Sequence, residues 1–275
     1  MVQPLDLNAA NEPMASTAAS SDLVRSIDRW IFVFMAVLLI AVTLTGFLPD
    51  SAMKVGLVEA GKRPPFPPIL HLHALATGSW LVLLLAQASL MASGRRAGHM
   101  QLGLAAMVLA PAVLVIGIIL VPTMYSQLWD TVHAMPGGPD AAGQLRLRAQ
   151  ANATLLQLRN GSMFALSVFV ALRLRKSDLA THKRLMILAP LSPVMAAIAR
   201  MTWLPTTMPG SPLSLELFTV SLIAPMFAWD LYRLRRIQRA YAIWFAAFIT
   251  LSVAVHLLWN TPWWLAFVPQ LMGLS

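Results

Sequence analysis

The sequence predicts an all-α integral membrane protein, a bundle of seven transmembrane helices. Hydrophobic residues make up 58% of the 275 residues and charged residues only 11%, whereas soluble domains carry about 25% charged residues. Long apolar runs recur along the chain, and a helix satisfies all of its own backbone hydrogen bonds in lipid. The runs lack the alternation at every second residue that is typical of a transmembrane β-barrel.

Each apolar run is close to the roughly 20 residues that a helix needs to cross the hydrocarbon core. We expect spans at about 30–48, 69–92, 102–121, 154–172, 185–204, 213–232 and 241–259. Residues 1–24 have no basic residue, so they lack the positive start of a signal peptide, and we expect a disordered cytoplasmic tail. Residues 25–260 then form the transmembrane domain. Residues 261–275, with Trp263 and Trp264, form an interfacial C-terminal segment.

The distribution of basic residues predicts the orientation of the bundle. Thirteen of the 20 lysines and arginines lie before the first span or in the second, fourth and sixth connections between spans. Because cytoplasmic segments are enriched in basic residues, the N-terminus is predicted to be cytoplasmic and the C-terminus outside. We therefore interpret the net charge of +9 as serving contact with the surface of the lipid bilayer rather than binding of nucleic acid. The alanine- and arginine-rich composition favours a bacterial plasma (inner) membrane.

Polar residues inside the predicted spans gather near the two surfaces and leave the middle almost purely apolar. Because such residues are costly in lipid, they tend to face the interior of the bundle. The chain has no cysteine, which excludes thiolate metal sites, iron–sulfur clusters and cysteine nucleophiles. The outer group is His71, His73, Gln157, Arg159, Asn160, Arg200, Glu216, His256, Trp259 and Asn260, and the inner group is His99, His182 and Asp230.

The second predicted span carries a polar stripe. His73, Trp80 and Gln87 are seven residues apart, with Thr77 four residues after His73, and these steps keep to one face of a helix. The stripe selects His73 as the inward histidine, while His71 faces a neighbouring helix or the lipid headgroups. In a purely structural interpretation, His73 bonds a backbone carbonyl across a helix interface. The candidate cofactor-binding residues are His73, His256, His71, Trp80 and Gln87.

Two arginines and one glutamate lie at a similar depth in the outer half. Arg159 and Arg200 either extend to the headgroups or line a pocket for an anion. Glu216 is the acidic residue that we place near them, and an Arg200–Glu216 ion pair between consecutive spans is the preferred structural account. At the inner surface, His99 and His182 begin two spans and are candidate metal ligands, with contact to headgroups as the alternative.

Four segments carry a resemblance: HLHALATGSWLVLLLAQ, GRRAGHMQLG, THKRLM and AAIARMTWLP. Together they resemble a loose group of uncharacterised bacterial multi-pass membrane proteins over residues 70–204. The resemblance implies that a shared pattern includes His71, His73, His99, His182 and Arg200. The resemblance implies no particular activity.

Several functions stay open at this point. The first is a redox protein that holds haem b or a divalent metal, with His73 and His256 around an outer site or His99 and His182 around an inner one. Two stacked haems are excluded, because the 26 residues from His73 to His99 span about 39 Å of helix, against a hydrocarbon core of roughly 30 Å. The others are a small-solute transporter, an enzyme acting on a lipid, and an accessory protein that binds a membrane partner.

Overall fold

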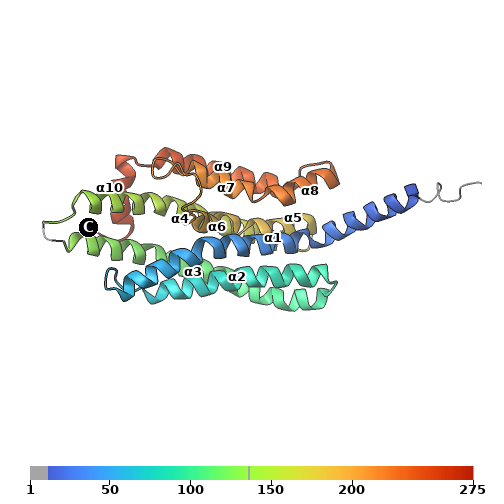
Figure 1. The fold of residues 1–275 in the computed structure, drawn as a ribbon, viewed down its shortest axis with the longest axis horizontal. Helices are drawn as coiled ribbons and strands as arrows, with labels where there is room; N and C mark the ends of the chain where they lie inside the picture. Colours follow the sequence, from blue (N-terminus) through green and yellow to red (C-terminus); the bar gives the residue numbers. More distant parts are fainter. Residues whose placement is uncertain (1–11, 136, 275) are drawn as a thin grey trace, which may run out of the picture.

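The computed structural model describes residues 12–135 and 137–274, with side chains from residue 22 onward. The described residues form ten helices that lie mostly along one axis, and they contain no strand (Figure 1). The helices are α1 (Glu12–Glu59), α2 (Pro68–Ala92), α3 (Arg96–His133), α4 (Ala141–Leu174), α5 (Leu179–Leu188), α6 (Leu191–Ile198), α7 (Leu213–Ser221), α8 (Ala224–Leu234), α9 (Arg239–Leu258) and α10 (Pro262–Leu271). The predicted all-helical class is confirmed.

Five of these helices are long and apolar enough to cross a membrane: α1 from Asp22 onward, α2, α3, α4 and α9. A sixth span arises if α7 and α8, which meet at a 46° bend, count as one. Pro225 lies directly after the break between these two helices, where its ring removes a helical hydrogen bond. The structure therefore supports a membrane protein with five or six spans among its described residues.

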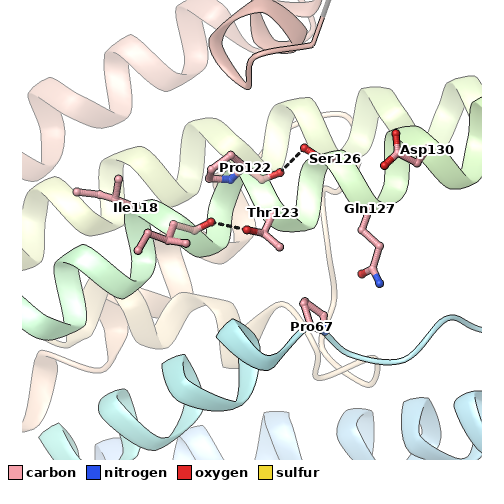
Figure 2. Close-up of a pocket in the computed structure, with 8 residues that line it drawn as sticks. Pro67, Ile118, Pro122, Thr123, Ser126, Gln127 and Asp130 are labelled. Atoms are coloured by element: carbon pink, nitrogen blue, oxygen red, sulfur yellow. Dashed lines mark hydrogen bonds between the residues drawn. The ribbon is translucent and has the colours of Figure 1, made fainter.

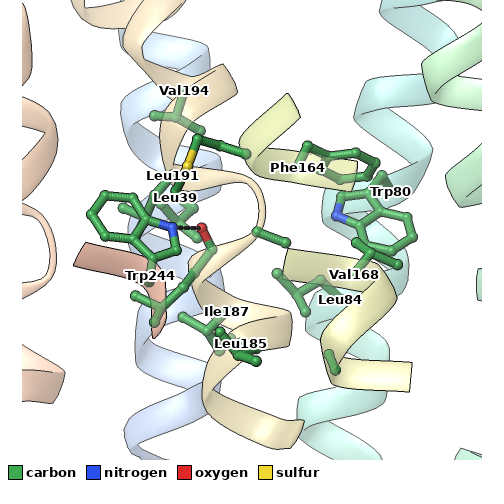
Figure 3. Packing of buried hydrophobic residues seen from close by; sticks show 14 of the residues in the cluster. Leu39, Trp80, Leu84, Phe164, Val168, Leu185, Ile187, Leu191, Val194 and Trp244 are labelled. Carbon is green, nitrogen blue, oxygen red and sulfur yellow. Dashed lines mark hydrogen bonds between the residues drawn. The ribbon is translucent and has the colours of Figure 1, made fainter. Parts of the chain in front are cut away.

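The segment predicted as the fifth span is divided into α5 and α6. Pro190 separates the two helices, since proline has no N–H to donate. At the break, the indole Nε1 of Trp244 donates to the carbonyl of Leu188 at 3.1 Å (Figure 3). The helix ends at Ile198 rather than at the predicted Leu204. This broken segment lies inside the bundle, where α6 packs against α1, α4 and α7, and α5 packs against α4 and α9.

Three helices extend well beyond a bilayer. Helices α1, α3 and α4 contain 48, 38 and 34 residues, and at 1.5 Å per residue even the shortest is about 51 Å long. The connection between the predicted spans that end at 121 and begin at 154 is mostly helix, because α3 continues to His133 and α4 begins at Ala141. Asp140 caps α4 by accepting from the backbone N–H of Gly143 at 2.6 Å.

The buried apolar residues that the structure describes form two clusters. The larger one includes Trp80, Phe164 and Trp244 and surrounds α5 (Figure 3). The smaller one lies at the other end of the bundle, where α10 packs on α4 and the indole of Trp264 donates to the carbonyl of Ala151 at 2.9 Å. Of the two tryptophans predicted at the interface, Trp264 is thus buried, whereas Trp263 is 60% exposed.

Candidate functional site

The polar stripe predicted on the second span lies on the packed side of α2. His71 is exposed, whereas His73 and Gln87 are half-buried and Trp80 is buried. The ring of Trp80 meets Phe164 of α4 edge-on at 5.0 Å between centroids. A Cβ on Gly103 of α3 would lie 3.6 Å from the amide nitrogen of Gln87. The stripe therefore faces α3 and α4.

Three members of this stripe carry an enclosed polar atom that makes no hydrogen bond to the described residues. These atoms are Nδ1 of His73, Nε1 of Trp80 and Oε1 of Gln87. The fourth member, Thr77, donates its hydroxyl to the backbone carbonyl of His73 at 2.7 Å. Buried polar groups are nearly always hydrogen-bonded, so such a row calls for a functional explanation. We call His73, Thr77, Trp80 and Gln87 the α2 polar row.

At the end of the bundle that is predicted to be inner, His99 and His182 lie near one another. Nδ1 of His182 donates to the carbonyl of Ala171 at 2.8 Å, which leaves Nε2 without a proton when the ring is neutral. Nδ1 of His99 is enclosed and makes no hydrogen bond within the part of the chain that the structure describes. The described residues offer no group of three histidine, aspartate or glutamate side chains that would hold a metal ion.

In the half of the bundle that is predicted to be outer, Arg159 and Glu216 form a buried ion pair between α4 and α7. The guanidinium of Arg159 also donates to Ser252 Oγ at 3.1 Å and to Asn160 Oδ1 at 3.3 Å. The second oxygen of Glu216 accepts from Nε2 of His256 at 2.8 Å. Arg159 is only 2% exposed and Glu216 7%. The side chains of this outer ion cluster satisfy one another, so Arg159 does not present an open pocket for an anion.

The predicted Arg200–Glu216 pair is wrong. Arg200 donates to Asp50 of α1 at 3.0 Å, and Lys54 binds the same carboxylate at 2.6 Å. The reason is geometric, because α6 ends at Ile198 and α1 continues beyond the predicted end of the first span. Asp50 is a residue that the sequence reasoning missed, although it lies only two positions after the first apolar run.

The structure does not bring His73 and His256 together. Helix α2 packs against α1 and α3, whereas α9 packs against α4 and α5, and the two helices lie on opposite sides of the bundle (Figure 1). Nε2 of His256 is already bonded to Glu216. The geometry thus gives no support to one haem held between these two imidazoles.

A second buried ion pair, at the end of the bundle that is predicted to be inner, was also missed. Arg184 binds both oxygens of Asp230, at 2.6 and 2.5 Å, and the hydroxyl of Tyr241 donates to Asp230 at 2.5 Å. Two parallel hydrogen bonds of this kind hold the guanidinium and the carboxylate in a defined geometry. The three side chains join α5, α8 and α9, so we assign them a structural role.

A groove of about 750 Å³ lies between the start of α2 and the C-terminal part of α3 (Figure 2). Pro67 forms one edge of this groove, and α3 supplies the rest.

No protein-family model, no curated protein and no solved structure matches the chain.

Proposed function

We propose that this protein lets a small, neutral, hydrogen-bonding solute cross the membrane along the α2 polar row. This proposal rests on three enclosed polar atoms on one face of α2 that make no hydrogen bond to any described residue. We further propose that the chain crosses a bacterial plasma membrane seven times, with its N-terminus in the cytoplasm and its C-terminus outside. In this arrangement α5 and α6 together form one crossing, as do α7 and α8.

The length of the row supports passage rather than binding at one surface. His73 and Gln87 are fourteen residues apart, which is about 21 Å of helix in a hydrocarbon core of roughly 30 Å. His99 on the neighbouring helix α3 carries a further enclosed atom that bonds to none of the described residues. A solute that makes hydrogen bonds would find a partner at each stage of this path.

The chemistry of the row favours a neutral solute. The indole N–H of Trp80 is a donor and the amide oxygen of Gln87 is an acceptor. Neither carries a formal charge, and no aspartate or glutamate belongs to the row. Since an ion in the bilayer needs a counter-charge or strong coordination, charged solutes fit this path poorly.

The two broken helices are consistent with transport. Discontinuous helices are typical of the binding regions of secondary transporters, because an interrupted helix exposes backbone groups near the middle of the membrane. In this protein the break between α5 and α6 lies within the larger apolar cluster, between the indoles of Trp80 and Trp244 (Figure 3). The hydroxyl of Ser192, just after the break, is also enclosed and has no hydrogen-bond partner among the described residues.

We expect purified protein in liposomes to accelerate the entry of glycerol or urea, measured by stopped-flow light scattering. Substituting Gln87→Leu keeps the side chain similar in size but removes its polar atoms. The loss of one hydrogen bond worth about 1.4 kcal/mol slows passage about tenfold. The matched control is His71→Ala, two residues from His73 but exposed, which should leave the rate unchanged.

Entry rates equal to those of empty liposomes for both solutes would contradict the proposal, as would full activity of Gln87→Leu. An absorption spectrum tests the redox alternative on the same sample. A Soret band that disappears in His73→Ala would favour haem binding over transport.

A further inference from the structure

The groove beside α3 changes from apolar to polar along its length. Its lining residues recur at steps of three and four, which places them on one face of α3. Ile118, Ile119 and Pro122 form the apolar part, and Thr123, Ser126, Gln127 and Asp130 form the polar part (Figure 2). The change occurs next to residue 121, where the predicted span ends. If the hydrocarbon core ends where the predicted span ends, the groove extends from the hydrocarbon into the headgroup region.

The polar part of the groove consists mainly of hydrogen-bond acceptors. Thr123 donates its hydroxyl to the carbonyl of Ile119 at 2.8 Å, and Ser126 donates to the carbonyl of Pro122 at 2.9 Å (Figure 2). Both hydroxyl oxygens keep lone pairs but have no hydrogen left to give. The amide nitrogen of Gln127 donates to the carbonyl of Pro65 at 3.0 Å, so its oxygen is also an available acceptor.

Asp130 gives this end of the groove a negative charge. Its carboxylate takes part in no ion pair with the described side chains, and it is exposed. The chain segment on the other side of the groove is basic, with Lys62 and Arg63 a few residues before Pro67. A ligand that matches both sides carries a cation with N–H groups and, next to it, an anion.

We propose that this groove binds a membrane phospholipid with a primary-amine headgroup, phosphatidylethanolamine. Its ammonium group donates to Asp130, Gln127 and the hydroxyl oxygens of α3. Its phosphate faces the segment of Lys62 and Arg63, and one acyl chain lies along Ile118 and Ile119. Phosphatidylcholine has the same phosphate and the same charges, but its quaternary ammonium has no N–H to donate. This site is independent of the proposed transport path.

Native mass spectrometry of the full chain in detergent tests the proposal with the two lipids at equal concentration and with identical acyl chains. We expect the protein to retain phosphatidylethanolamine in preference to phosphatidylcholine. In Asp130→Asn the affinity for phosphatidylethanolamine should fall about tenfold, because a charge-assisted hydrogen bond is lost. The matched control is Glu59→Gln, which removes an exposed carboxylate at the end of α1 and should leave the preference intact.

Equal retention of the two lipids would overturn the proposal, and so would an unchanged preference in Asp130→Asn. Competition by glycerophosphoethanolamine, which has the headgroup but no acyl chains, provides one more test. If it competes as well as the intact lipid, the apolar part of the groove takes no part in binding and the assignment to a lipid is wrong. None of these outcomes depends on solute flux, so the transport proposal is tested separately.

Discussion

Substitution of Glu216 by glutamine is expected to lower the free energy of unfolding by about 3–5 kcal/mol, because it leaves a buried guanidinium without a counter-charge. Arg159 is 2% exposed and has Glu216 as its carboxylate partner. A guanidinium cannot lose its proton inside a protein, so the charge stays. Unfolding of the detergent-solubilised protein, followed by circular dichroism, measures the loss.

The same chemical change at a more exposed ion pair supplies the control. Asp50→Asn removes the carboxylate that pairs with Arg200, whose side chain is 31% exposed. Solvent screens that pair, so we expect a loss of at most about 1 kcal/mol. Equal losses for Glu216→Gln and Asp50→Asn would show that the outer ion cluster is less buried than its contacts indicate.

A double substitution separates the charge from the packing. Replacing Arg159 by methionine and Glu216 by leucine together removes both charges and keeps similar side-chain volumes. Buried ion pairs exchanged for apolar residues are often neutral or stabilising. The double variant should therefore be more stable than Glu216→Gln alone.

The second large effect is expected at Gly46, where α1 crosses α6. A Cβ added at this position would lie 2.1 Å from the backbone oxygen of Ala197. Backbone cannot rotate away as a side chain can, so the two helices must separate. We expect Gly46→Ala to lower the free energy of unfolding by about 1–3 kcal/mol or more, measured by the same unfolding experiment.

Gly56 lies on the same helix and provides the comparison. A Cβ on Gly56 would meet nothing within 4 Å. Because alanine favours helix over glycine by about 1 kcal/mol, Gly56→Ala should stabilise the protein or leave its stability unchanged. A loss of stability in Gly56→Ala as large as that in Gly46→Ala would refute the close crossing of α1 and α6 as the cause.

The helices could be predicted better than their ends. An apolar run indicates which residues can lie in lipid, but it does not indicate where the helix ends. Helices α3 and α4 continue past the predicted limits at residues 121 and 154, and Asp140 begins α4 through a local cap. The break between α5 and α6 follows from Pro190, which the hydropathy of the surrounding run conceals.

The partners of the charged residues were harder to predict than their depth. Arg159, Arg200 and Glu216 were placed at similar depths, yet each arginine pairs with a different carboxylate. The contact between Arg200 and Asp50 joins residues 150 positions apart. Such pairing depends on which helices are neighbours in the bundle, and a single sequence does not specify the neighbours of each helix.

By itself, the sequence determined that the protein is helical and suited to a membrane, and it determined which face of α2 carries the polar row. Both properties are local, since hydropathy and a period of 3.6 residues act within one helix. Only the tertiary structure decided that His73 and His256 are separated and that Glu216 binds Arg159. These facts depend on how distant helices pack, because the energy of a buried charge is set by the partner that the fold brings to it.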